Sequence, residues 1–183
     1  MEKYITTPIT KEKVKDLKVG DYVYITGTIY TARDAAHKRM YDSLINGNRL
    51  PIDLKDTIIY YLGPTPERPG EVIGSAGPTT SSRMDKYTPL LIEYGLTGMI
   101  GKGKRNTKVK EAIVKNTCVY FAAVGGAGAL LSKKILKSNV IAYDDLGTEA
   151  IRELYVKDFP VIVVVDSTGE DLYEKAPLEF NII

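Results

Sequence analysis

The alternation of hydrophobic and polar residues along the chain predicts a mixed order of strands and helices. Residues 21–30 are rich in β-branched and aromatic side chains and follow the turn signal Gly20-Asp21, so we expect a strand there. Short apolar runs predict further strands at 57–61, 72–75, 97–101, 118–124, 139–143, 150–156 and 161–166. The helical period predicts helices at 82–94, with a kink at Pro89, at 106–116 and at 127–137.

A further helix is expected directly after the first strand. Thr31-Ala32-Arg33-Asp34 resembles a capping box, with Thr31 as the N-cap and Asp34 in the third helical position. Asn46-Gly47 marks the expected end, because glycine is favoured just beyond a helix C-terminus.

Strands outnumber helices in this pattern, and short turns join several of them. A doubly wound parallel sheet needs helices that alternate with strands throughout, so it fits this order poorly. We therefore predict an α/β fold, a single domain over residues 1–183 with a mixed, barrel-like sheet. Residues 1–19 are rich in charged side chains and are expected to be a solvated lead-in.

The composition supports a folded domain and limits its partners. Hydrophobic residues make up 44% of the 183 residues, which is enough for a core. The 25 Lys and Arg residues against 23 Asp and Glu residues give a net charge of +2, which argues against a dedicated nucleic-acid binder. Neither an apolar run of about 20 residues nor a signal-peptide core is evident, so we expect a cytoplasmic protein.

The single cysteine and the single histidine restrict the chemistry of the chain. Cys118 and His37 cannot by themselves supply three or four cysteine ligands or a site of three histidines. Cys118 lies in an apolar run and is expected to be an inert core thiol. We therefore expect no metal ligand from this chain.

The loop Gly77-Pro-Thr-Thr-Ser-Ser-Arg-Met-Asp85 is the strongest candidate for a binding site. Ser82 and Asp85 have the spacing of a capping box, which predicts a helix start. Thr79, Thr80 and Arg83 would then lie at the positively polarised end of that helix, where an anionic small molecule binds well.

Two other segments carry cations at predicted strand ends. Arg33 can bind a carboxylate or phosphate through two parallel hydrogen bonds, although for an arbitrary Arg–Asp pair a solvated helix face with a surface ion pair is the commoner explanation. His37 lies four residues on, on the same helix face, where a lone histidine is more often structural than catalytic. The glycine-rich turn at 101–105 presents Lys102 as a point charge, or else is a solvated turn.

Two glycine-rich patterns do not match nucleotide-binding motifs. The turn at 101–105 lacks the Walker A spacing, because Leu96 stands where a glycine is needed and Gly103 where a hydroxyl residue is needed. In Ala123-Val-Gly-Gly-Ala-Gly-Ala-Leu-Leu131, Leu131 replaces the small residue of a dinucleotide fingerprint. We interpret this segment as close packing between a helix and a strand.

Taken together, the cations predict the class of ligand. Arg33, Arg83 and Lys102 would neutralise about two negative charges, which favours a dicarboxylate or a phosphorylated molecule. A threonine accepts a proton only when strong positive charge or a metal lowers its pKa. A further group must therefore activate the chemistry.

Three motifs in order carry a resemblance to a known family. They are Gly27-x-x-x-Thr31-Ala-Arg-Asp-Ala-Ala-His-Lys-Arg39, Gly77-Pro-Thr-Thr-Ser-Ser-Arg-Met-Asp85 and Gly101-Lys-Gly-Lys-Arg105. From about Gly20 to Tyr173 the chain resembles the β subunit of the iron-sulfur class I fumarases and L-tartrate dehydratases. The resemblance implies a swivelling β/β/α domain over 20–173. It also implies a partner α subunit, with three cysteines that hold a 4Fe-4S cluster, in an α2β2 heterotetramer.

The resemblance also implies roles for individual residues. Arg33, Arg83 and Lys102 match positions that bind substrate carboxylates, and Thr79 matches the proposed proton acceptor. Asp34, His37 and Thr80 would support them, and the proton donor would belong to the partner. The leading expectation is a fumarate hydratase that forms L-malate. The alternatives are an L-tartrate dehydratase or a mesaconate hydratase and, from another class, a non-catalytic anion-binding or regulatory module.

Overall fold

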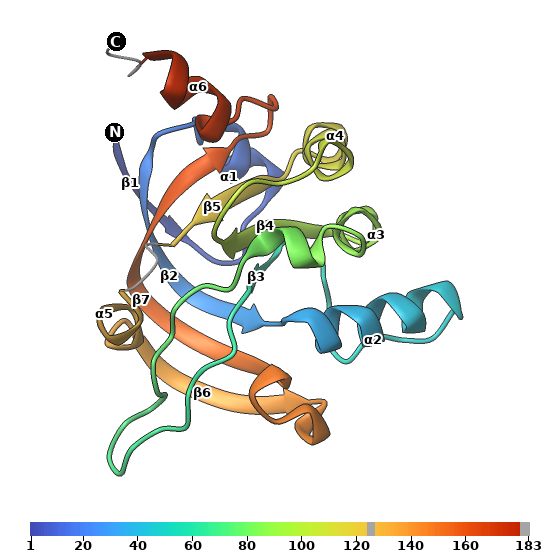
Figure 1. Cartoon of the computed structure of the whole chain (residues 1–183), viewed down its shortest axis with the longest axis vertical. Coiled ribbons are helices and arrows are strands. Elements are labelled where there is room, and N and C mark those ends of the chain that lie inside the picture. The colour runs from blue at the N-terminus through green and yellow to red at the C-terminus, as the bar shows by residue number, and fades with distance from the viewer. Residues whose placement is uncertain (124–126, 180–183) are drawn as a thin grey trace.

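The computed structural model describes residues 1–123 and 127–179, in which seven strands form one sheet (Figure 1). Their order is β1 (Glu2–Thr6), β2 (Tyr22–Thr31), β3 (Thr57–Tyr60), β4 (Leu96–Gly101), β5 (Val119–Ala122), β7 (Ile151–Val165) and β6 (Ile135–Ala142). The pairs from β1 to β5 are parallel, whereas β7 runs antiparallel to β5, β6 and β2.

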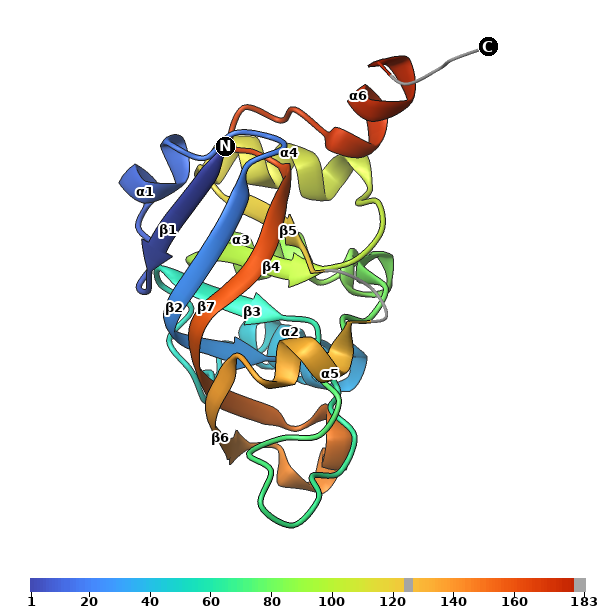
Figure 2. The same ribbon diagram turned by 90° about the vertical axis from the view of Figure 1, so that its left-hand side faces the viewer.

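The additional pairing of β2 with β7 closes the sheet into a barrel of β2, β3, β4, β5 and β7. Figure 2 shows β2 and β7 side by side, with β1 and β6 extending the sheet on either side. Closure pairs the backbone groups that two open edges would leave unpaired. The predicted α/β fold with a mixed, barrel-like sheet is therefore confirmed.

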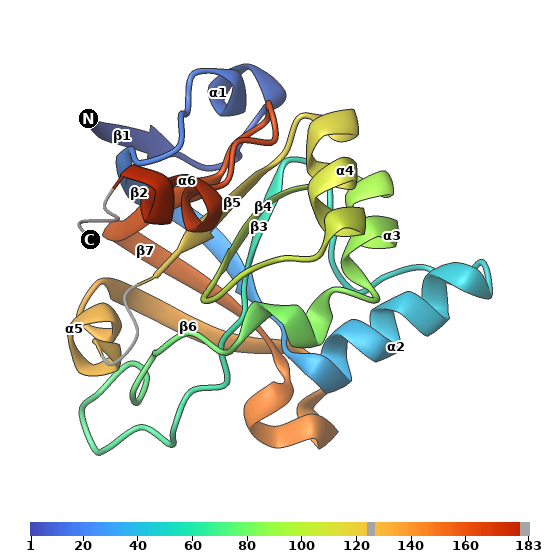
Figure 3. The ribbon, with the colours of Figure 1, turned by 45° about the horizontal axis from the view of Figure 1, so that its top comes forward.

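The helices are short and lie around this barrel. They are α1 (Lys11–Lys15), α2 (Asp34–Ile45), η1 (Ser81–Met84), α3 (Thr88–Glu93), α4 (Thr107–Asn116), α5 (Gly128–Ser132), η2 (Asp144–Glu149) and α6 (Leu172–Glu179). Figure 3 shows α2, α3 and α4 along one side of the barrel, with α5 on the other. Among the described helices, none is long and apolar enough to cross a membrane.

Two hydrophobic clusters follow from the period of two in the strands. On β3 and the residue after it, Ile58 and Tyr60 belong to the cluster that fills the barrel, whereas Ile59 and Tyr61 belong to the cluster under α2, α3 and α4. Successive side chains of a strand point to opposite faces, so one strand supplies both clusters. The barrel wall is thus buried on both faces, which explains the near-continuous apolar runs in the sequence.

Most of the predicted elements are present. The structure confirms the strands over 57–61 and 97–101 and the helix over 106–116, within one residue. The predicted strand over 118–124 is seen as β5, and residue 124 lies outside the described residues. The strands predicted at 150–156 and 161–166 are one strand, β7, which continues through Asp158 at a φ of 48°, where the amide of Asp158 donates to Thr26 Oγ1.

The predicted strand at 72–75 is wrong. This segment bends, and its backbone pairs locally, because Ser75 donates to Thr65 Oγ1 at 2.8 Å and Thr65 donates to the carbonyl of Ser75 at 3.3 Å. The helix predicted at 127–137 ends at Ser132, since the antiparallel pairing of Ile135 with Val156 takes the following residues into β6. Tertiary pairing overrides helical propensity there.

Two helix starts also differ from the sequence-based prediction. The helix expected over 82–94 is split into η1 and α3, and Pro89 lies in the first turn of α3 instead of kinking one helix. Thr31 is not a cap, because it is the last residue of β2 and its hydroxyl accepts from the amide of Arg152 at 3.0 Å. The helix α2 ends as predicted, with Asn46 as its C-cap.

The ends of the chain contain more structure than the sequence suggested. Residues 1–19, expected to be a solvated lead-in, include β1 and α1, and their apolar residues Ile9, Val14 and Leu17 are buried. The helix α6, which was not predicted, lies at the top of Figure 1. It contacts the barrel through Tyr173, whose hydroxyl accepts from the amide of Gly103 at 3.1 Å.

Candidate active site

The loop with the two threonines lies across the ends of β3 and β4. The amide of Thr79 donates to the carbonyl of Tyr61 at 2.7 Å, and Pro78 forms an antiparallel bridge with Leu62. Thr80 forms a parallel bridge with Lys102, directly after β4. Thr79 is therefore held between two strand ends, where its side chain is partly exposed. The structure brings Thr79, Thr80 and Lys102 together, as the site hypothesis requires.

Arg33 reaches the same end of the sheet from the start of α2. Its side chain lies over Gly63, where an added Cβ would come within 2.6 Å of Arg33 Nη1. Gly63 follows Tyr61 and Leu62 beyond β3, so Arg33 and Thr79 flank one short segment. The Nε atom of Arg33 faces Glu149 Oε1 at 3.4 Å and Asp34 Oδ2 at 3.8 Å.

Arg83 joins this group through Asp34. Its Nε donates to Asp34 Oδ1 at 2.7 Å, so one carboxylate lies between the two arginines. The Arg83 side chain is 51% exposed, and within the described ranges its terminal nitrogens have no hydrogen-bond partner. An arginine held by Nε keeps its terminal nitrogens available for a ligand carboxylate.

The carboxylates change the charge balance expected from the sequence. Asp34 and Glu149 lie against Arg33 and Arg83, so the two arginines are already compensated. With Lys102, the five groups carry one net positive charge. The expectation that three cations neutralise about two negative charges counted the cations alone. Full neutralisation of a dicarboxylate here needs positive charge from outside this group.

Glu149 has a second contact, which the sequence did not reveal. Its Oε2 accepts from the amide of Ala35 at 3.1 Å, in the first turn of α2. The N-cap residue of that helix is Arg33, whose side chain makes no capping bond. Glu149 therefore caps α2 from 114 residues away. No local pattern predicts this, because the pairing depends on where η2 lies.

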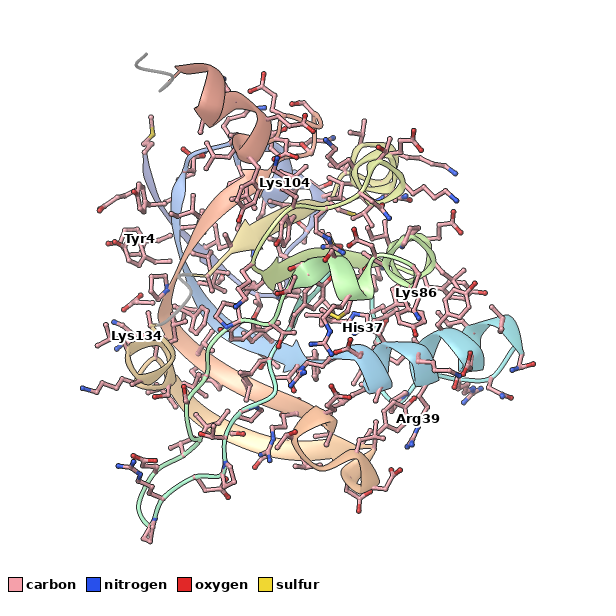
Figure 4. The ribbon with its side chains drawn as sticks, in the orientation of Figure 1. Tyr4, His37, Arg39, Lys86, Lys104 and Lys134 are labelled. Carbon is pink, nitrogen blue, oxygen red and sulfur yellow. The ribbon has the colours of Figure 1, made fainter. Side chains whose placement is uncertain are left out.

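His37 is buried beneath this group, at the start of α2 (Figure 4). Its Nδ1 donates to the carbonyl of Arg33 at 2.9 Å, whereas Nε2 has no partner among the described residues. Its ring stands edge-on to Tyr61, with centroids 5.2 Å apart. Burial lowers the pKa of His37 to about 4, so the ring is neutral at neutral pH. His37 holds the backbone of Arg33 and does not supply charge.

His37 also makes the fold sensitive to acid. Because the folded pKa of about 4 lies below the ordinary histidine pKa of 6.5, the unfolded chain binds the proton first as pH falls. Stability from this group is complete above pH 6.5, and about 3 kcal/mol is lost between pH 6.5 and pH 4. The chain has one histidine, so its NMR signal is unambiguous. We expect no titration of that signal between pH 8 and pH 5, and a midpoint near 6.5 would contradict the burial.

The predicted anion site at a helix start is wrong in its geometry. The helix η1 has four residues and no side-chain cap, and α3 begins only at Thr88. Asp85 is not part of a capping box with Ser82, because its carboxylate accepts from Arg105 Nε at 2.6 Å and from the amide of Asn106 at 2.7 Å. The loop with Thr79 and Thr80 therefore lies at strand ends and not at the start of a capped helix.

Arg105 lies below the site and is fully buried. Besides Asp85, it donates from Nη2 to Thr88 Oγ1 at 2.9 Å, and its guanidinium lies 5.3 Å from the Tyr61 ring and 4.9 Å from the Tyr120 ring. A buried guanidinium needs such partners. The pair Asp85–Arg105 thus joins η1, which follows the threonine loop, to the turn after β4, which carries Lys102.

The glycine-rich segment packs against the site loop. Residues 124–126 of this segment lie outside the described residues. A Cβ on Gly128 would come within 2.3 Å of Ser75 Oγ and 2.9 Å of the amide nitrogen of Gly77. Close packing was predicted between a helix and a strand. At Gly128 it is found between α5 and the loop that leads to Thr79.

Cys118 does not fit the role of a cluster ligand. Its thiol is buried and donates to the carbonyl of Leu96 at 3.2 Å, at the opposite ends of β4 and β5 from Lys102. Burial raises its pKa to about 12, which keeps it protonated, as expected for an inert core thiol. In the part of the chain that the structure describes, no group of three or more His, Cys, Asp or Glu side chains could hold a metal ion.

Comparison with known proteins identifies the family. The profile of the family described as Fumarase C-terminus matches residues 2–176. The chain belongs to the Fumarase C-terminus family. The resemblance found from the three sequence motifs is thereby confirmed, and the family's match extends it back to include β1 and α1.

Relatives fall into two groups by length. A protein of Methanocaldococcus jannaschii, provisionally named L(+)-tartrate dehydratase subunit beta, is 40% identical over 178 residues, which cover 94% of this chain and 91% of the relative. Fumarate hydratase 2 of Leishmania major is 38% identical over 92% of this chain, and the anaerobic class I fumarate hydratase of Escherichia coli is 39% identical over 86%. This chain spans only 30% and 29% of those two enzymes.

Proposed function

We propose that this chain is the β subunit of a hydro-lyase for a short dicarboxylate, and that its leading reaction is the reversible hydration of fumarate to L-malate. The observation that carries the proposal is the convergence of Thr79, Lys102 and two arginines at the ends of β3 and β4. Membership of the Fumarase C-terminus family supports the reaction class.

Each residue has a role that suits its contacts. The free terminal nitrogens of Arg83 bind one substrate carboxylate, and Arg33 and Lys102 bind the other, as a fork and as a point charge. Thr79, held by its backbone beside them, accepts the proton from the substrate carbon next to the hydroxyl-bearing one. Asp34 and His37 orient the arginines, and Thr80 sets the bridge to Lys102.

A partner α subunit completes the site in this proposal. The 4Fe-4S cluster implied by the resemblance belongs to that subunit, since Cys118 does not fit as a ligand. The α subunit also supplies the proton donor, in an α2β2 assembly. The exposed Arg83 and Lys102 and the single net positive charge of the group fit a site that another chain covers.

L-Tartrate dehydration is the second candidate. It is favoured by the Methanocaldococcus jannaschii relative, which this chain matches over 91% of its length. Hydration of mesaconate, which is a methylated fumarate, uses the same carboxylate-binding residues, Arg33, Arg83 and Lys102. Ser81 and Ser82 do not by themselves distinguish these dicarboxylates.

Co-expression with an α subunit tests the proposed function. The chain should be colourless and inactive alone, and its complex with a cysteine-bearing α partner should turn over fumarate, L-tartrate or mesaconate after anaerobic cluster reconstitution. The rates for the three substrates, measured side by side, identify the preferred one. Turnover by the isolated chain would contradict the two-subunit proposal, and an inactive, reconstituted complex would favour a non-catalytic module.

A further inference from the structure

The hydroxyl group of Ser81 lies between the two loops that carry the proposed catalytic groups. Ser81 is fully buried, although it is flanked by the exposed residues Thr80 and Ser82. Its Oγ accepts from the amide of Lys102 at 3.0 Å, and its own amide donates to the carbonyl of Lys102 at 2.9 Å. One residue therefore satisfies both backbone groups of Lys102.

The Ser81 hydroxyl accepts the hydrogen bond that regular strand pairing does not provide for the amide of Lys102. Thr80 and Lys102 meet in an isolated bridge, not in a continued ladder, so regular strand pairing ends there. The amide of Lys102 would otherwise lack an acceptor from the site loop, and an unpaired backbone amide is unfavourable in this part-buried position. Ser81 Oγ supplies the acceptor and extends the register of β4 by one residue.

Space for this hydroxyl depends on Gly101. A Cβ built on Gly101 would lie 1.9 Å from Ser81 Oγ and 2.8 Å from Tyr61 Cδ2. Both atoms lie in a packed interior, so neither can move away cheaply. The glycine before Lys102 and the serine after Thr80 thus fit each other.

Tyr120 contacts both Ser81 and the residue that follows Lys102. Its ring is fully buried on β5, and its hydroxyl lies 2.8 Å from Ser81 Oγ and 2.8 Å from the carbonyl oxygen of Gly103. The guanidinium of Arg105 covers its ring at 4.9 Å. Lys102 is therefore held on one side by Ser81 and, through Gly103, on the other side by Tyr120.

We propose that Ser81 and Tyr120 are positioning residues that set Lys102 against Thr79. This proposal rests on the proposed hydro-lyase function and deepens it, because it assigns the placement of one carboxylate-binding group to two buried hydroxyls. Neither hydroxyl touches the substrate. They act through the backbone of Lys102, so the substrate-binding ammonium group and the proton acceptor keep a fixed separation.

Amide exchange in the full chain tests the positioning without any enzyme assay. In Ser81→Ala the amide of Lys102 loses its acceptor, and we expect its exchange, followed by NMR, to be at least about tenfold faster. In Tyr120→Phe the same amide should exchange faster by a smaller factor, because Ser81 keeps its own contact. Cys118→Ala is the matched control, since it removes one buried heteroatom from the opposite end of the same strands. It should leave this amide unchanged.

Kinetics of the reconstituted complex test the consequence for the reaction. Ser81→Ala should raise KM for the dicarboxylate about tenfold and lower kcat by a similar factor, because both Lys102 and its distance to Thr79 change. Tyr120→Phe should change both in the same direction. The double variant should lose less than the product of the two single effects, since the two hydroxyls act on one another.

The outcomes separate this proposal from the proposed function. An unchanged Lys102 amide in Ser81→Ala, or wild-type KM and kcat in that variant, would overturn the positioning role. Equal losses in Cys118→Ala would attribute the effect to general destabilisation and would also overturn it. If the wild-type complex turns over none of the dicarboxylates, the proposed function fails, and amide exchange still decides whether Ser81 places Lys102. If Ser81→Ala does not fold, Tyr120→Phe gives the same two measurements.

Discussion

Replacement of Thr79 by alanine is expected to lower kcat of the reconstituted complex by about 10²- to 10⁴-fold and to change KM by less than about threefold. Thr79 contacts the site through its backbone, which alanine preserves in the bond to Tyr61. The variant therefore loses the hydroxyl and keeps the clamp of Arg33, Arg83 and Lys102. A group that acts only in the transition state affects kcat far more than binding.

Two matched variants make this result specific. Thr79→Ser keeps the hydroxyl and should retain most of the activity. Thr57→Ala removes a threonine hydroxyl from the opposite end of β3, where it donates to the carbonyl of Asp53, and should leave kcat unchanged. Steady-state kinetics of the three variants give kcat and KM for each. Wild-type kcat in Thr79→Ala would remove this residue from the mechanism.

The largest effect on stability is expected from Asp85→Ala. This change leaves the Arg105 guanidinium buried without its carboxylate, and it also removes the acceptor of the Asn106 amide, the N-cap residue of α4. Breaking one partner of a buried ion pair costs about 3–5 kcal/mol, because the remaining charge is uncompensated. Urea denaturation of the chain should show a loss of this size.

An exposed pair in the same chain provides the control. Arg39 and Asp145 form two hydrogen bonds of 2.8 Å each, but the two side chains are 39% and 62% exposed. Solvent screens such pairs, so Asp145→Ala should shift the urea midpoint far less than Asp85→Ala does. Similar losses in the two variants would show that the burial of Arg105 does not determine its contribution to stability.

The sequence predicted those elements whose signals are local. The helix α4 was placed within one residue from its helical period, and the structure adds that Asn106 accepts from the amide of Val109 as its N-cap. The strands β3 and β4 were placed because their apolar runs are buried on both faces of the barrel. The motif residues Thr79, Arg83 and Lys102 were chosen for the chemistry of their side chains, and the structure places the threonine loop against Lys102 and Arg83 against Asp34.

Local signals failed where distant segments meet. Thr31 and Asp34 have the spacing of a capping box, but the strand β2 continues through Thr31, and Glu149 caps the helix instead. Ser82 and Asp85 have the same spacing, but Asp85 is taken by the buried Arg105. A short motif shows only which hydrogen bonds its residues could form. A stronger contact with a residue distant in the sequence determines which bond is formed.

The sequence by itself determined the class of fold, the cation-rich and hydroxyl-rich character of the site and the family, because composition, period and ordered motifs carry these. Only the tertiary structure decided how the site is assembled. Parallel pairing of β3 with β4 places their ends beside each other, where Ser81 meets Lys102, and the pairing of β2 with β7 that closes the barrel brings Glu149 to Arg33. These contacts join residues far apart in the chain, and their free energy depends on burial and distance, which exist only once the strands have paired and packed.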